Sequence, residues 1–329
     1  MATDSPEPLT TEDVSRPNQL WRSAVGEFRA LAGLAILCVV MFFLSPHFLT
    51  TTNLLNILQQ ISIVSIVAVG MTFVIISGGI DLSVGSVVAF AGLIMAILMK
   101  EWELPVWPTI LIGLLAGCVM GLVNGLLVAL IRLPPFIATL GMMSIARGAS
   151  FTISGGSPVY SLPESFLAIS GRVGILPIPA LIMIAIFVLG ALVLKYTKLG
   201  RYTYAIGGNE TASVLSGIGV KTYKVVIYTL SGLFCAVSAI LLTAKLDSAV
   251  PVAADGYELD AIASVVIGGT SMLGGEGKIS GTLIGALIIG VVNNGLNLLT
   301  VPQGPQRVVK GAIIILAVCV DLMRKRGRR

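Results

Sequence analysis

Amide side chains interrupt several otherwise apolar stretches of the 329-residue chain. Seven of them are candidates for contact with a solute: Asn56, Gln59, Gln60, Asn124, Asn293, Asn294 and Asn297. An amide donates and accepts hydrogen bonds without net charge, which suits a neutral polyhydroxylated solute. Because polar groups at membrane depth imply a cavity or a partner, we hypothesise that these seven line a translocation path. The alternative is that they only bond neighbouring helices.

The sequence offers little for covalent chemistry. His47 is the only histidine and lies beside Pro46 in an expected loop. The cysteines fall inside apolar runs with no paired spacing, which supports neither a disulfide set nor a metal site: they are Cys38, Cys118, Cys235 and Cys319. We therefore expect no enzyme activity and no bound metal in this chain.

The chain also lacks an energy source of its own. The segment 274–279, GGEGKI, is the nearest approach to a phosphate-binding loop, but it lacks the first glycine spacing, and Ile279 replaces the Ser or Thr that would hold magnesium. No row of carboxylates in the middle of helices offers coupling to protons or sodium ions. If the chain moves a solute uphill, we expect it to take energy from a partner and to bind no cofactor itself.

The longest polar interval, residues 199–220, predicts a short amphipathic helix outside the membrane. Gly207-Gly208 is expected to break the chain, and Asn209 to cap the helix by accepting from free N–H groups. Glu210 in the first turn suits the helix dipole. The apolar face consists of Val214, Leu215 and Ile218. Such a helix is a handle for another protein, and an ordinary loop is the alternative.

Composition places the chain in the membrane class. Apolar residues make up 56%, charged residues only 11%, and the mean hydropathy is +0.97, whereas soluble domains carry about 25% charged residues. Ten apolar runs lie near 28–44, 54–76, 84–99, 108–131, 135–153, 178–195, 223–244, 259–269, 279–299 and 307–323. About 20 helical residues cross the hydrocarbon core, so we predict an all-α polytopic membrane protein with about ten transmembrane helices, the eighth being short.

Basic residues set the expected orientation. The chain has 21 Lys and Arg against 16 Asp and Glu, a net charge of +5, and such an excess indicates topology rather than nucleic-acid binding. A cytoplasmic N-terminus places 15 of the 21 inside: Arg16, Arg22, Arg29, Arg132, Lys195, Lys198, Arg201, Lys221, Lys224, Lys278, Arg324, Lys325, Arg326, Arg328 and Arg329. We therefore predict a cytoplasmic tail at 1–27, a transmembrane domain at 28–323 with a cytoplasmic loop at 196–222, and a basic cytoplasmic tail at 324–329.

A weak internal repeat relates the two halves. The segment from Asp81 resembles that from Asp260, and Asn124-Gly125-Leu126 matches Asn294-Gly295-Leu296. Five crossings per half would invert one half relative to the other, which is typical of transporters. A structural role is expected for Asp81, as the cap of the third helix, and for a close-packing stripe on the fourth helix: Gly113, Gly117, Gly121 and Gly125.

Charged residues also fall near the expected outer mouth. Arg147 and Lys310 lie inside apolar runs, where they are expected to reach the interface or pair with acids of a loop. Glu258 and Asp260, at the start of the eighth run, have a similar position.

Six segments together resemble the membrane subunits of bacterial ABC importers for monosaccharides. They are NLLNILQQ (53–60), AVGMTFVIISGGIDLSVGS (68–86), PPFIATLGMM (134–143), LGRYTYAIGGNETASVLSGIGV (199–220), GYELDAIASVVIGGTSMLGGEGKISGTLIGALIIG (256–290) and NNGLNLL (293–299). The similarity covers roughly 50–320. Within this family, which includes importers of ribose, xylose, arabinose and galactose, the ribose permeases are most similar.

The resemblance implies an ABC importer permease fold in the bacterial inner membrane. Two permease copies would surround a central path for a monosaccharide. A cytoplasmic ATPase with two fused nucleotide-binding domains would hold ATP and magnesium, and a periplasmic sugar-binding protein would deliver the sugar. Ribose is the best single expectation. A secondary sugar transporter that works without an ATPase is the alternative.

The resemblance also assigns a coupling helix to the loop between the sixth and seventh spans. Carried over to this chain, it falls on Gly200, Arg201, Tyr204, Gly207, Gly208, Asn209, Glu210, Ala212 and Gly217. We add Val214 and Leu215 as the side chains expected to pack into a groove of the ATPase.

Overall fold

The computed structural model describes residues 17–326, and the remaining residues of the two predicted tails lie outside this range. Every predicted apolar run is helical. These helices are α1 (Pro17–Leu44), α2 (Thr51–Ile76), α3 (Val84–Lys100), α4 (Val106–Ala129), α5 (Pro135–Ser154), α7 (Ile178–Tyr196), α10 (Val220–Leu246), α11 (Tyr257–Ile267), α12 (Ile279–Leu298) and α13 (Gln303–Arg326). α1 begins at Pro17, so it includes the last part of the predicted N-terminal tail.

Among the described residues, six helices are long and apolar enough to cross a membrane, namely α2, α4, α5, α7, α10 and α12. Two shorter apolar stretches lie at Ala30–Leu44 and Val84–Lys100. The fold is thus that of a polytopic membrane protein. The count of ten crossings and the inversion of one half relative to the other stay predictions.

The core is built around α2. Its residues from Ile61 to Ile76 are buried with the exception of Val64, which is half-buried, because helices α7, α10, α11 and α12 pack around it. A helix that is apolar on all sides suits such a central position.

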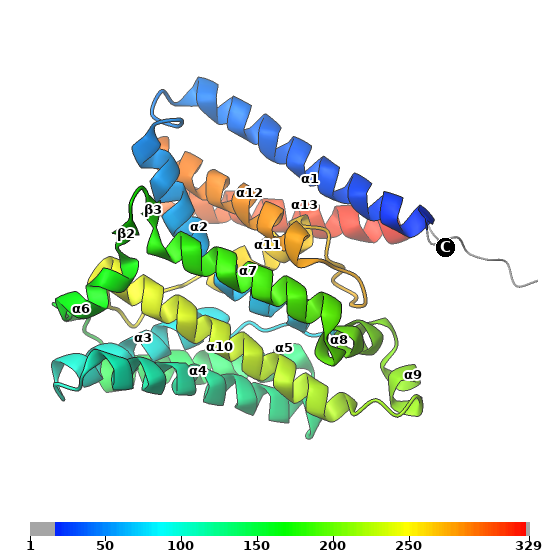
Figure 1. The fold of residues 1–329 in the computed structure, drawn as a ribbon, viewed down its shortest axis with the longest axis horizontal. Coiled ribbons are helices and arrows are strands. Elements are labelled where there is room, and N and C mark those ends of the chain that lie inside the picture. The colour runs from blue at the N-terminus through cyan, green and yellow to red at the C-terminus, as the bar shows by residue number, and fades with distance from the viewer. Residues whose placement is uncertain (1–16, 327–329) are drawn as a thin grey trace, which may run out of the picture.

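α4 and α10 lie side by side along most of their length (Figure 1). The predicted glycine stripe of α4 faces this contact. A Cβ at Gly117 would meet the carbonyl of Gly232, and one at Gly121 would meet the carbonyl of Tyr228. At the two ends of the stripe, Gly125 packs against the backbone of Val225 and Gly113 against Met95 of α3. Small residues let helix backbones approach in this way.

The two ends of the bundle differ in their short elements (Figure 1). One end carries α8 (Lys198–Gly208) and α9 (Glu210–Leu215), and α1 begins and α13 ends there too. The opposite end carries α6 (Glu164–Leu167), the 3-10 turn η1 (Ala168–Ser170) and two small antiparallel pairs. In these pairs β1 (Val159–Tyr160) joins β4 (Ser248–Ala249), and β2 (Arg172–Val173) joins β3 (Leu176–Pro177).

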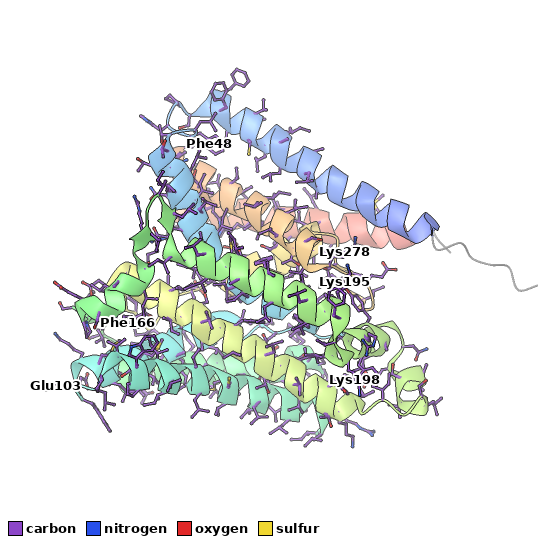
Figure 2. All side chains as sticks on the ribbon, viewed as in Figure 1. Phe48, Glu103, Phe166, Lys195, Lys198 and Lys278 are labelled. Carbon is purple, nitrogen blue, oxygen red and sulfur yellow. The ribbon has the colours of Figure 1, made fainter. Side chains whose placement is uncertain are left out.

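Three lysines mark the end that carries α8 and α9. Figure 2 shows Lys195, Lys198 and Lys278 together at the α8–α9 end, and Glu103 and Phe166 at the opposite end. Lys195 and Lys198 flank the sharp turn from α7 into α8, where Thr197 accepts the N–H of Gly200. The basic end is the side that the basic residues predict to be cytoplasmic.

Candidate translocation cavity and coupling helices

A cavity of about 390 Å³ lies between α2, α10, α11, α12 and α13, toward the end of the bundle away from α8. Its apolar wall includes Ile61, Ile63 and Ile289. Its polar side chains are Gln60, Ser65, Lys245, Tyr257, Asp260, Asn293, Asn297, Gln306 and Lys310. This volume falls in the range of about 300–1,000 Å³ that is usual for small-molecule sites, which also combine apolar walls with a few polar groups.

An ion pair stands in the cavity wall. The Lys310 Nζ lies 2.9 Å from Asp260 Oδ2 and donates to it, and the amide of Asn293 donates to the same oxygen over 3.2 Å. The Asp260 side chain is almost fully buried, and that of Lys310 is a quarter exposed. Lys310 thus pairs with an acid, as predicted, but the acid belongs to helix α11 and not to a loop.

Three of the seven predicted path residues line this cavity: Gln60, Asn293 and Asn297. Asn297 also accepts from the amide of Gln306. The Oδ1 of Asn293 is buried and has no hydrogen-bond partner within the described chain. Asn56 and Gln59 lie outside the cavity: Asn56 is exposed, and Gln59 donates to Ser170 of η1.

Two predicted path residues bond neighbouring helices instead. Asn294 of α12 exchanges two hydrogen bonds with Asn53 of α2, with lengths of 3.0 and 2.8 Å. Asn124 of α4 donates to the hydroxyl of Ser83 over 2.8 Å, just before α3. Both Asn124 and Asn294 are buried. The alternative interpretation of buried amides therefore describes the contacts of these two residues.

Asp81 is not the cap of α3, as the sequence had predicted, but links the residue before α3 to α10. α3 begins at Val84, and the residue in the cap position is Ser83. The Asp81 carboxylate accepts from the backbone N–H and the hydroxyl of Ser83 through Oδ1, and from Ser231 of α10 through Oδ2. The sequence predicted that Asp81 contacts the start of α3. The bond to α10 was not predictable, because Ser231 is 150 residues away.

At the basic end, the predicted short helix is present as α9. The Asn209 side chain accepts the N–H of Ala212 over 2.9 Å, as a cap does. Glu210, in the first turn, forms an ion pair with Lys224 of α10 at 2.7 Å. Val214 and Leu215 are 57% and 84% exposed, so both apolar side chains are free to contact another protein. Gly217 follows with a positive φ of 78°, which glycine adopts at little cost.

The helix α8 includes Gly207 and ends at Gly208, so the predicted break between two helices falls directly after the glycine pair, at Asn209. Gly207 is needed for space, since a Cβ there would collide with the carbonyl oxygen of Ile76 at the end of α2. The same carbonyl accepts the N–H of Gly275 over 2.9 Å. The three backbones of α8, α2 and the loop before α12 thus meet at one point.

Tyr204 makes a second link from α8 to that loop. Its hydroxyl donates to the carbonyl of Gly277 over 2.7 Å. Burial raises the pKa of the Tyr204 phenol, which keeps it in the donating form. Gly200 and Arg201 lie at the turn from α7, where a Cβ at Gly200 would meet the carbonyl of Leu194 and Arg201 donates to Tyr196.

A second hollow, of about 350 Å³, lies beside α9. The turn between α4 and α5 contributes Arg132 and Pro134, and the start of α10 contributes Lys221 and Lys224. Val214 and Glu210 form its α9 side. The side of α9 that carries Val214 thus lies beside a groove lined by the basic residues Arg132, Lys221 and Lys224.

The chain is similar to known membrane transport proteins along nearly its whole length. Residues 53–318 match the family described as "Branched-chain amino acid transport system / permease component". The chain is 45% identical to the ribose import permease protein RbsC of Escherichia coli K12, over 95% of this chain and 99% of that protein. It is 47% identical to RbsC of Bacillus subtilis 168, over 88% of this chain and 90% of that protein. The L-arabinose transport system permease protein AraH of Escherichia coli K12 is 38% identical, with 92% of both chains covered.

Proposed function

Because the chain belongs to the family of branched-chain amino acid transport system permease components, we propose that it is the membrane permease subunit of an ABC importer that carries a monosaccharide into the cytoplasm. Ribose is the proposed sugar. The observation that carries the proposal is the full-length similarity to ribose import permeases. The partly polar cavity inside an apolar bundle supports it independently.

The energy for uptake comes from a partner in this proposal. A cytoplasmic ATPase with two fused nucleotide-binding domains binds ATP and magnesium and hydrolyses ATP, and the permease itself is not an enzyme. A second permease copy completes the membrane part, and a periplasmic sugar-binding protein delivers the sugar. The complex spans the inner membrane, with both termini and the loop 196–222 in the cytoplasm.

α9 is the proposed contact with the ATPase. Its Val214 and Leu215 are apolar and exposed at the basic end, and a protein surface with a matching apolar groove would bury both. The ion pair between Glu210 and Lys224 holds α9 against α10, so that a push on α9 also acts on a long helix of the bundle.

The force then passes through α8. Gly207 contacts the end of α2, and Tyr204 holds the loop that leads into α12. Both α2 and α12 line the cavity at their other ends. A movement of α8 would therefore tilt the two helices that carry Gln60 and Asn293, and this is how closure of the ATPase would change access to the cavity.

Reconstitution tests the function. Proteoliposomes that contain the permease and its ATPase, supplied with the sugar-binding protein, should accumulate D-ribose only when ATP is hydrolysed. Omission of the ATPase should abolish uptake. Uptake by the permease alone that follows an ion gradient would contradict the proposal and favour a secondary transporter.

A further inference from the structure

We propose that Asp260 is the group by which the permease recognises its sugar, accepting hydrogen bonds from hydroxyls of the monosaccharide as it passes the cavity. Lys310 acts beside it as a donor to the oxygens of the sugar. This inference rests on the proposed function. It assigns the substrate contact to a charged pair, whereas the path predicted from the sequence consisted of amide side chains alone. Its physical basis is the unused hydrogen-bonding capacity of the pair.

The Asp260 carboxylate has capacity to spare. An ionised carboxylate offers about four lone-pair sites and donates nothing. Oδ2 accepts from Lys310 and Asn293, whereas Oδ1 accepts no hydrogen bond from any residue in the described range 17–326. The carboxylate lines the cavity, so a sugar hydroxyl is a fitting donor for it. A hydrogen bond to an ionised acceptor is also about twice as strong as one between neutral groups.

Lys310 has capacity left as well. An ammonium has three donors, and the described structure uses one of them, on Asp260. Around the pair stand neutral groups that both donate and accept, among them Gln60, Asn293 and Asn297. A neutral polyol presents both donors and acceptors, so it matches a wall that combines a carboxylate, an ammonium and amides.

A purely structural ion pair has a different pattern. A buried pair stabilises a fold when further hydrogen bonds satisfy the remaining lone pairs and protons. Here the remaining capacity adjoins a cavity. The chain also offers a matched structural pair: Asp255 and Arg307, 2.7 Å apart, connect the segment before α11 to the same helix α13, but both are largely exposed and neither lines the cavity.

The test compares Asp260→Asn with Asp255→Asn in the complete complex in proteoliposomes, with D-ribose as the probe and the same sugar-binding protein throughout. Two quantities are measured: ribose transported per ATP hydrolysed, and the ATPase rate. We expect Asp260→Asn to lower the first by about tenfold while the complex still assembles and hydrolyses ATP. Asp255→Asn should remain close to wild type.

The double variant Asp260→Asn with Lys310→Gln separates recognition from helix packing. It removes both charges, so no unpaired ammonium is left between α11 and α13, and it keeps side chains that can bond to each other. If the double variant regains wild-type transport per ATP, the pair only joins helices and the inference is overturned. Continued loss of transport in an assembled double variant supports recognition.

The outcome also separates this inference from the proposed function. If the wild-type complex transports no ribose or other monosaccharide, the proposed function fails. If the wild type transports ribose and Asp260→Asn transports it equally well, the function stands and only the role of Asp260 is refuted.

Discussion

Asn53 and Asn294 donate to each other, with the Asn53 Nδ2 3.0 Å from the Asn294 Oδ1 and the Asn294 Nδ2 2.8 Å from the Asn53 Oδ1. The pair joins α2 to α12 near one end of the bundle, and both side chains are buried. Asn53 also donates to the carbonyl of Phe48 over 2.8 Å. These hydrogen bonds fix the register of the two long helices relative to each other.

Removal of both amides should destabilise the protein less than the sum of the two single removals, because each single variant leaves the other amide without its partner. Asn294→Ala leaves the Asn53 amide buried without its partner, which costs about 1–3 kcal/mol. Asn53→Ala removes the bond to Phe48 as well and should destabilise more. In thermal unfolding of the detergent-solubilised protein, Asn53→Ala with Asn294→Ala should lose less than the sum of the single variants. Strict additivity would show that the two amides do not interact.

Gly207→Ala should disrupt the contact between α8 and α2. The new Cβ would collide with the Ile76 carbonyl, a backbone group that cannot move aside cheaply, and overpacking of this kind costs about 1–3 kcal/mol. The control is Gly208→Ala, because nothing lies within 4 Å of a Cβ at Gly208. We expect Gly207→Ala to lower both the unfolding temperature and ATP-driven uptake, and Gly208→Ala to leave the unfolding temperature unchanged. Wild-type uptake by Gly207→Ala would show that the contact between α8 and α2 does not transmit force.

Val214→Asp should separate the protein from the proposed ATPase. The substitution places a charge on the exposed apolar face of α9, where burial against a partner would leave that charge desolvated. Thr211→Asp is the control, because Thr211 is exposed in the first turn, where an acid suits the helix dipole. Copurification of the ATPase should fail with Val214→Asp and persist with Thr211→Asp. Glu210→Lys, which repels Lys224, should weaken coupling as well.

The predicted path is tested by Asn56→Ala combined with Gln60→Ala. With expression and assembly unchanged, sugar uptake should fall, because the combination removes two of the proposed hydrogen-bonding groups. Only Gln60 lines the described cavity, so Gln60→Ala alone should account for most of the loss. An unchanged rate for the double variant would argue against a path along this face of α2.

Sequence patterns predicted the helices well because a long apolar run has few alternatives in a membrane. The cap at Asn209 was predictable for a similar reason, since its bond to Ala212 spans three residues. The second role of Gly207, which is to admit a neighbouring backbone, was not predicted, because a glycine that ends a helix and one that makes room for a neighbour look alike in sequence. Only the position of Ile76, 131 residues earlier, distinguishes them.

The cavity shows the same limit. Gln60, Asn293 and Asn297 were predicted to share a surface, and the structure places them around one cavity. The sequence could not separate them from Asn294, which adjoins Asn293 but points to a different neighbour. Nor could it pair Lys310 with Asp260, since that contact depends on how α13 packs against α11.

The glycine stripe of α4 limits which parts of the permease can slide. Its backbone is in direct contact with that of α10 at Gly117 and Gly121, with no side chain to separate the two helices. A shift of one helix along the other by a single residue would press Cβ atoms into these carbonyls. We therefore expect α4 and α10 to move together as one rigid body during the transport cycle. The hinges must then lie elsewhere in the bundle.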